Sequence, residues 1–459
     1  MTQHEQYEEY EQHDGLSELW AMIPEAGEPT RATAVIPAPG PTPPKPRRLR
    51  SRLIAIISTV LVLAVIATYV SLTLSAPVGA AAAAFHSPVV SKPGAAVIAL
   101  PGYGESALSV SGADDYLGPT ADGVFASSGG NGALPMASIS KLITAMVVLS
   151  ARPLGASGTG PTITWDKPDA ALYDKYYLLN ATIAAMKNGS SMSEHDALET
   201  MLVVSACNYA EAMADWAFGS NAGFVSATRK WLKANGLTGT TMVEPTGLDD
   251  RNTSTPSDLI ALGKLAMANP AVAAMVGRTS LDVPSLAGLP STNDLLGTDG
   301  VNGIKTGTLD SDGSDLLFSA IVPIHTGLSL TVIGVVLGGP TRAGVDSDVK
   351  NTIASIQAGF HDMQLGSQGQ VVGSYSTPWG AKASMVLAKD ANAFTWSDTP
   401  ITSTMKTTTL KSGKSGEQVG RVTWVAGKTT ESVPVVLKGS IRGPSPWWRL
   451  THPAELLGK

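Results

Sequence analysis

The sequence predicts an α/β protein in which an antiparallel sheet is flanked by helices, followed by a small all-β domain. Two apolar, β-branched runs at 314–322 and 328–337 are joined by His325-Thr326-Gly327, a pattern typical of a β-hairpin. Helical patterns occupy most of the chain between residues 137 and 268, which indicates a helical lobe between the early and late strands. Beyond about residue 366, short alternating runs separated by Gly and Ser predict strands alone.

The composition limits the classes of function. The chain has 459 residues, of which 43% are hydrophobic, enough for two or three domains with packed cores. Its formal net charge of −6 gives no reason to expect a nucleic-acid partner. The single cysteine, Cys207, excludes an internal disulfide bond.

No metal or cofactor is expected from the sequence. His195 with its acidic neighbours Glu194 and Asp196, and His361 with Asp362, lack a ligand spacing such as His-Glu-x-x-His. We interpret both groups as solvated surface residues.

The N-terminal part predicts a disordered cytoplasmic tail at 1–52 and a membrane anchor at 53–74. The tail is acidic and aromatic and then Pro-rich, with a short docking helix at 16–23 as the alternative. Residues 53–74 carry no charge and can span a hydrocarbon core of about 30 Å. Basic residues precede this run, which places the N-terminus in the cytoplasm and the remainder of the chain outside: Lys45, Arg47, Arg48, Arg50 and Arg52. A cleavable signal peptide is the alternative, but its apolar region would be shorter.

The predicted elements then follow in order. A linker is expected at 75–93, an α/β domain at 94–365 and a β-rich domain at 366–459. The first strand is expected at 95–100. Helices are expected at 137–149, 170–188, 193–199, 221–235, 256–268 and 346–360. Strands of the last domain are expected at 370–375, 383–388, 418–425 and 432–438. Four tryptophans are assigned to its core, with a glycan-stacking surface as the alternative: Trp379, Trp424, Trp447 and Trp448.

Ser138 and Lys141 lie where a short polar stretch enters an apolar helical pattern. Their spacing puts a hydroxyl and an amine on one face of a helix. A serine becomes a nucleophile when a base takes its proton, and a neutral amine one turn away can do so. The unpaired N–H groups at the helix start would suit an oxyanion. Alone, the spacing also fits a helix start followed by an ordinary surface lysine.

Two further stretches complete a known signature. Ser205-Ala206-Cys207-Asn208 lies between apolar helical runs, and Lys305-Thr306-Gly307 precedes the predicted hairpin. Ser-x-x-Lys, a Ser-x-Asn-type element and Lys-Thr-Gly are the signature of penicillin-binding proteins and class A β-lactamases. With Pro245-Thr246-Gly247-Leu248 between the second and third motifs, residues 88–360 resemble the D-alanyl-D-alanine carboxypeptidases, which are low-molecular-mass penicillin-binding proteins. The resemblance implies the penicillin-binding, β-lactamase-like transpeptidase fold.

The resemblance also implies an acyl-enzyme mechanism on the pentapeptide stems of peptidoglycan. Ser138 would attack the carbonyl between the last two D-alanines. Lys141, kept neutral by burial and by the positive field of Lys305, would be the base, directly or through a water molecule. The backbone N–H groups of Ser138 and Thr308 would bind the oxyanion.

The remaining motif residues would handle the leaving group and the substrate. Ser205 would relay a proton to the departing D-alanine nitrogen. Lys305 and Thr306 would bind the terminal carboxylate, with Gly307 beside them. A β-lactam antibiotic mimics the terminal dipeptide and would acylate Ser138.

Cys207 departs from the family pattern, which places asparagine at the third position of the second motif. That asparagine binds the substrate amide, and a thiol is a weak donor and acceptor. Cys207 would support slower turnover, or Asn208 would replace it, or the protein would bind cell-wall peptides without efficient catalysis. A small buried cysteine of no consequence is the fourth interpretation.

A β-lactamase is the enzymatic alternative. Glu244 would then be the element that activates the deacylating water. Thr246-Gly247-Leu248 follows Glu244 closely, and this is not the Glu-x-x-Leu-Asn arrangement of class A enzymes. The sequence therefore favours an exported, membrane-anchored carboxypeptidase.

Overall fold

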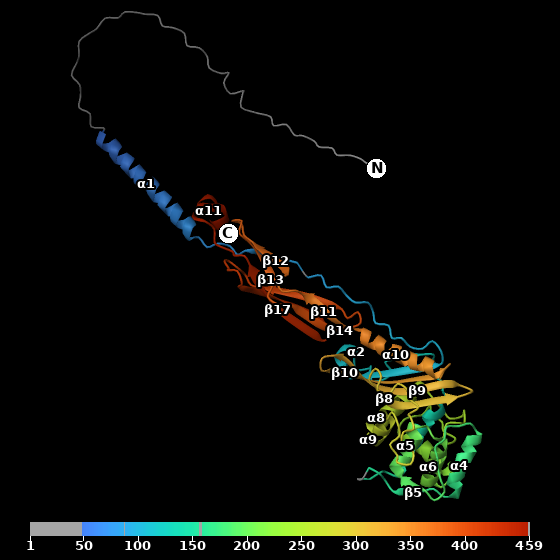
Figure 1. Ribbon diagram of the computed structural model, residues 1–459. Coiled ribbons are helices and arrows are strands. Elements are labelled where there is room, and N and C mark those ends of the chain that lie inside the picture. The colour runs from blue at the N-terminus through green and yellow to red at the C-terminus, as the bar shows by residue number, and fades with distance from the viewer. Residues whose placement is uncertain (1–47, 87, 156–157, 458–459) are drawn as a thin grey trace, which may run out of the picture. The chain divides into compact units, whose positions relative to one another are not determined.

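The computed structural model describes residues 48–86, 88–155 and 158–457 (Figure 1). Most of the predicted tail, including the helix considered at 16–23, lies outside these residues. The chain divides into two units, the first ending at Ser75 and the second beginning at Ala76.

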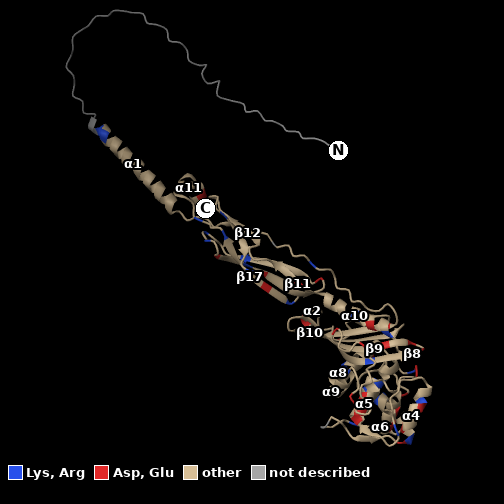
Figure 2. Cartoon of the chain, viewed as in Figure 1, with Lys and Arg blue, Asp and Glu red and all other residues tan. Residues whose placement is uncertain are grey.

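The first unit contains one long helix, α1 (Arg48–Ser75). Its residues 50–75 are long and apolar enough to cross a membrane, and their apolar side chains are exposed. Figure 2 shows basic residues at the start of α1 and no charged residues along the rest of it. The helix begins before the predicted span, because the residues from Arg48 to Arg52 form its first turn. It is consistent with a membrane anchor.

A five-stranded antiparallel sheet forms the centre of the site-bearing region, which we define as residues 105–358. Its order is β3-β2-β10-β9-β8. The bounds are β2 Glu105–Ser111, β3 Ala126–Ser128, β8 Val301–Leu309, β9 Gly313–His325 and β10 Leu328–Gly339. The predicted hairpin is confirmed as β9 and β10, and β8, which carries Lys305, pairs with β9.

The strand predicted at 95–100 is wrong, because these residues are irregular. Side chains of helix α10 (Arg342–Ala358) take the place of a neighbouring strand. Ser355 accepts from the Ala99 N–H at 3.0 Å, and Thr352 donates to the Ala99 carbonyl at 2.6 Å. The apolar residues of this stretch therefore pack beside the sheet rather than within it.

Helices cover both faces of the sheet (Figure 1). Helix α10 packs on one face through Val345, Val349 and Ile353, which share a buried cluster with β9 and β10. The helical lobe packs on the other face, with α8 against β2, β9 and β10. Its helices are α3 Ser140–Ala151, α4 Lys167–Leu178, α5 Glu194–Val203, α6 Cys207–Phe218, α7 Asn221–Ala234, α8 Pro256–Ala268 and α9 Pro270–Val276. The shorter elements are α2 Asp114–Leu117, β4 Leu134–Pro135, η1 Ala137–Ile139, β5 Thr162–Thr164, β6 Ser191–Ser193 and β7 Thr253–Ser254.

The helix predicted at 170–188 ends at Leu178 instead. Asn180 has a left-handed backbone, with φ of 51°, and the segment after it bonds to α6. Thr182 accepts from the Cys207 N–H at 2.8 Å, and Ala184 exchanges two hydrogen bonds with the Asn208 side chain. The chain leaves the helix to form these long-range bonds.

The C-terminal β region, residues 360–457, contains a six-stranded sheet in the order β1-β12-β13-β17-β16-β15. Strand β1 (Ala82–Phe85) comes from the predicted linker and pairs with β12. The other elements are β11 Phe360–Gly366, β12 Val371–Ser376, β13 Lys382–Leu387, β14 Ala391–Trp396, β15 Ile401–Thr407, β16 Gln418–Ala426, β17 Thr429–Lys438, α11 Pro446–Thr451 and α12 Pro453–Leu457.

The four tryptophans assigned to the core of this region have different environments. Trp424 is fully buried, as expected. Trp379 and Trp448 pack edge to face with ring centroids 5.8 Å apart, and Trp447 is 74% exposed. The core assignment therefore fails for Trp379, Trp447 and Trp448, which lie outside the buried cluster of this region.

Candidate active site

Ser138 and Lys141 meet at the start of the first helix of the lobe. Ser138 lies in the 3-10 turn η1, which leads into α3. Lys141 is fully buried, and its Nζ lies 2.8 Å from Ser138 Oγ and 2.6 Å from the Thr246 carbonyl oxygen. An amine that donates to the Thr246 carbonyl can turn its lone pair toward the serine hydroxyl, which is the geometry of a general base.

A second amine and hydroxyl pair faces the first. Ser205 lies in the loop between α5 and α6, with φ of 64°, and its Oγ accepts from Lys305 Nζ at 3.0 Å. Burial, together with the cations Lys141 and Arg342, holds the pKa of the Lys305 ammonium well below its usual range. The Cys207 side chain opposes this shift. The three predicted motifs therefore converge in one site.

Cys207 and Asn208 begin helix α6, but their side chains have different surroundings. Cys207 is buried, and no hydrogen bond of its thiol is found among the described residues. The Asn208 amide is fully buried. Its Oδ1 accepts from the Ala184 N–H at 3.2 Å, and its Nδ2 donates to the Ala184 carbonyl at 2.9 Å. The Asn208 amide is thus already bonded to another segment, which argues against the hypothesis that it replaces the usual asparagine.

The third motif lies on β8 against the nucleophile turn. A Cβ added to Gly307 would come within 2.9 Å of the Ala137 Cβ, so glycine permits the close approach of β8 and η1. Thr306 Oγ1 is hydrogen-bonded to Thr292 Oγ1 at 2.7 Å. Thr308 Oγ1 donates to the Gly307 carbonyl at 2.6 Å.

Arg342 is a site residue that the sequence analysis missed. It is the first residue of α10, and its Nη2 donates to Thr308 Oγ1 at 2.8 Å while its Nη1 donates to the Thr292 carbonyl at 3.0 Å. Its Nε has no hydrogen-bond partner among the described residues. The only signal in the sequence is a threonine that caps a helix just after the second strand of the hairpin, which is common in unrelated proteins.

Glu244 fixes the loop that contacts Lys141. Its carboxylate accepts from the N–H groups of Thr246 and Gly247, each at 2.6 Å, and from Asn252 Nδ2 at 3.0 Å. Gly247 has φ of 82°, and a Cβ there would lie 1.9 Å from the Ala137 carbonyl oxygen. The carboxylate is engaged by the backbone, which argues against the deacylating role that a β-lactamase would give it.

The group around His195, which we interpreted as solvated, is partly buried, whereas Asp362 is exposed. Glu194 is fully buried and Glu199 nearly so. His195, Asp196 and Glu199 place ligand-type atoms within 4.8 Å of one another. Arg278 Nε lies 3.0 Å from Glu199 Oε1, so this group forms an ion-pair network. The surface interpretation is therefore wrong for Glu194.

Comparisons with known proteins agree with this geometry. Residues 120–341 match the family described as D-alanyl-D-alanine carboxypeptidase. The chain is 28% identical over 211 residues to D-alanyl-D-alanine carboxypeptidase DacC of Escherichia coli, covering 45% of this chain and 51% of that protein. It is 33% identical over 128 residues to a D-alanyl-D-alanine endopeptidase of the same organism, covering 28% and 38%. The chain thus spans about half the length, or less, of these two relatives.

A solved structure confirms the predicted fold class. Penicillin binding protein 6B from Escherichia coli superposes with a TM-score of 0.50 at 19% identity, over 76% of this chain and 98% of that chain. At this identity the likeness shows the fold alone.

Proposed function

We propose that this chain, which belongs to the family of the D-alanyl-D-alanine carboxypeptidases, removes the terminal D-alanine from peptidoglycan stem peptides through an acyl-enzyme. The observation that carries the proposal is the contact of 2.8 Å between Lys141 Nζ and Ser138 Oγ, together with the contact of 3.0 Å between Lys305 Nζ and Ser205 Oγ. One amine and hydroxyl pair can supply the base for the attack on the substrate carbonyl, and the other can supply the proton that the leaving nitrogen needs.

Acylation begins when Ser138 Oγ attacks the carbonyl carbon of the penultimate D-alanine and its proton passes to Lys141 Nζ. The Thr246 carbonyl, 2.6 Å from that nitrogen, orients the amine. The N–H groups of Ser138 and Thr308 receive the developing oxyanion. Ser205 then passes a proton to the departing D-alanine nitrogen and takes up the proton that Lys141 gained, so that Lys141 is neutral again when water attacks and Lys305 stays charged.

The cations around β8 suit a free carboxylate at the end of the substrate. Lys305 and Arg342 flank Thr306 and Thr308, and Arg342 Nε is unpartnered among the described residues. An anion bound here would be stabilised by two cations whose pKa values are both lowered by burial. This favours cleavage next to a C-terminus over cleavage within a chain. Water then releases the acyl group.

Helix α1 anchors the protein in this proposal. The basic residues at its start favour the cytoplasmic side for the N-terminus, so the site acts on peptidoglycan outside the membrane.

The buried thiol of Cys207 favours a second candidate, a protein that binds cell-wall peptides and turns them over poorly. We expect Cys207→Asn to raise the rate of D-alanine release about threefold to tenfold, because an amide donates to a substrate carbonyl where a thiol does so weakly. Cys207→Ala is the control for volume. An unchanged rate of D-alanine release in Cys207→Asn would show that the thiol does not slow the reaction.

The function is tested with the full chain in detergent. D-alanine release is measured from a peptide ending in Lys-D-Ala-D-Ala, with Ser138→Ala as the blank. Release that is lost in the variant supports the carboxypeptidase. Labelling of Ser138 by a fluorescent penicillin without release would favour the binding protein, and rapid nitrocefin hydrolysis would favour a β-lactamase.

A further inference from the structure

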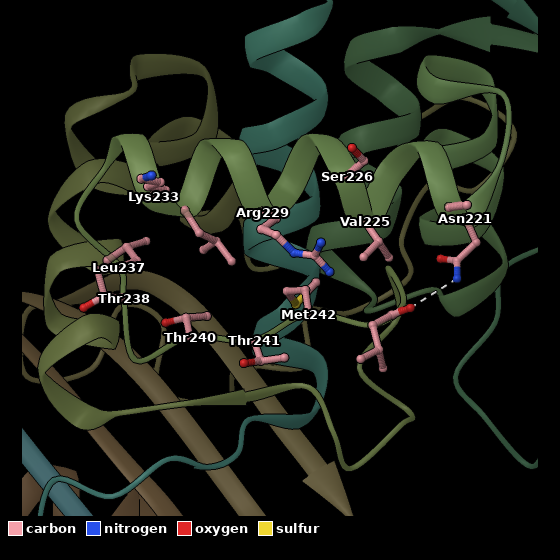
Figure 3. A pocket seen from close by; sticks show the side chains of 13 residues that line it. Asn221, Val225, Ser226, Arg229, Lys233, Leu237, Thr238, Thr240, Thr241 and Met242 are labelled. Carbon is pink, nitrogen blue, oxygen red and sulfur yellow. Dashed lines mark hydrogen bonds between the residues drawn. The ribbon is translucent and has the colours of Figure 1, made fainter.

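A groove on the helical lobe lies outside the site described above. It lies between α7 and the segment 237–243 that follows it, and encloses about 750 Å³ (Figure 3). Its floor is apolar, formed by the buried side chains of Leu232, Leu237 and Met242. We call this feature the α7 groove.

The α7 groove is positively charged. Arg229 and Lys233 lie one turn apart on α7, and Figure 3 shows the Arg229 side chain extending over Met242 toward the opposite wall. None of the described residues that line the groove is acidic, although the chain has a formal net charge of −6. Asp258, the nearby acid, is held outside the lining by Thr240 and by the Gly239 N–H.

Hydroxyl groups complete the lining. Thr238 and Thr241 project from the segment opposite α7, and Ser226 from α7 itself. Two cations, an apolar floor and a row of hydroxyls suit a ligand that combines a carboxylate with sugar rings, which have apolar faces and hydroxyl edges.

The α7 groove is continuous with the loop that contacts the catalytic pair. Asn221 lines both this groove and a second cavity of about 530 Å³, whose lining includes Glu244, Pro245 and Thr246. The Asn221 side chain donates to the Val243 carbonyl at 3.1 Å (Figure 3). Consecutive residues of one segment therefore lead from the groove to the carbonyl that accepts from Lys141.

We propose that the α7 groove is a secondary substrate site, which binds a neighbouring part of a peptidoglycan strand, its sugar rings and the free carboxylates of its stem peptides, while one stem peptide occupies the site at Ser138. This inference rests on the proposed function. It makes the enzyme selective for polymeric substrate, because a short peptide in the site at Ser138 does not reach Arg229 and Lys233.

The test compares two substrates with the full chain. D-alanine release is measured from a Lys-D-Ala-D-Ala peptide and from soluble glycan strands that carry pentapeptides. We expect the double variant Arg229→Glu with Lys233→Glu to raise KM for the strands about fivefold to tenfold. Its kcat for the strands, and both kinetic constants for the short peptide, should stay the same. Lys230→Glu is the matched control, since Lys230 is exposed on the same helix and does not line the groove. The milder double variant Arg229→Gln with Lys233→Gln shows whether a loss of affinity comes from the removed charges or from a folding defect.

A binding measurement separates this inference from the proposed activity. The Ser138→Ala full chain is titrated with fluorescent strands, and we expect the charge-reversed pair to weaken binding by the same factor. High salt should also weaken the binding of strands to the Ser138→Ala chain, because it screens the attraction between charges. The inference is overturned if the charge-reversed double variant binds strands as tightly as the wild type, or if its rate of D-alanine release falls equally for strands and for the short peptide. It is also overturned if inorganic phosphate displaces strands at an ionic strength at which chloride does not.

Discussion

The site-bearing region and the C-terminal β region bury different kinds of side chain. The core of the β region is apolar, with Thr395 as its one buried polar residue among the described residues 360–457. The site-bearing region buries Lys141 and Lys305 in the same site. A buried cation costs several kcal/mol unless it is well paired. The difference indicates that one region accepts a cost in stability for its chemistry, and that the other supplies stability without chemistry.

The largest effect is expected for Lys305→Met. Release of D-alanine should fall about 1,000-fold, because the variant loses the cation that bonds Ser205 and faces the substrate carboxylate. The free energy of unfolding should stay the same or rise by about 1 kcal/mol, since an apolar side chain replaces a buried cation. Steady-state kinetics and urea unfolding measure the two quantities. Lys350→Met, at an exposed position on α10, is the control, and a loss of stability by several kcal/mol would contradict the comparison.

The opposite outcome is expected for Trp424→Ala in the β region. Removal of this fully buried side chain should lower the free energy of unfolding by about 3–5 kcal/mol. Activity per folded molecule should stay the same. Trp447→Ala removes the same side chain from a position that is 74% exposed, and it should change stability little. Equal effects of the two variants on unfolding would show that the β region does not depend on its apolar core.

Glu244→Gln tests whether a half-buried acid near the candidate active site acts through the backbone. The amide would present a donor to backbone N–H groups that now meet two carboxylate oxygens, so the loop and its Thr246 carbonyl should shift. We expect acylation by a fluorescent penicillin to slow about 10-fold to 100-fold, with release of the adduct unchanged. Asp250→Asn, at an exposed position in the same loop, is the control. Slower release with normal acylation would instead support a deacylating role.

The sequence predicts the parts of this molecule that depend on short spacings. Ser138 with Lys141, the β9 and β10 hairpin, and helix α8 follow from local patterns, and the structure places them as the sequence implies. The rest depends on contacts between distant segments. Lys141 bonds a carbonyl 105 positions away, and Thr352 bonds Ala99 at a separation of 253. No periodicity reports such pairs, which explains the wrong strand at 95–100 and the missed Arg342.

The smallest effect concerns Glu194, a buried acid of the site-bearing region that lies outside the candidate active site. Its carboxylate oxygens have no hydrogen-bond partner among the described residues, and burial raises its pKa to about 7, with the Arg152 cation opposing. The native state therefore keeps a proton that the unfolded chain releases near pH 4.5, so the free energy of unfolding falls as pH rises from there to about 7.

Glu194→Gln should remove this dependence on pH. Near pH 4 the variant and the wild type should be equally stable, because the wild-type carboxyl is protonated in both states. At pH 8 the variant should be more stable by about 1–2 kcal/mol, because it has no carboxylate to ionise in an apolar site. Urea unfolding across this range measures the difference, with Glu455→Gln as an exposed control. A parallel pH dependence in both proteins would mean that Glu194 is solvated, and the cost of buried charge would then be confined to the candidate active site.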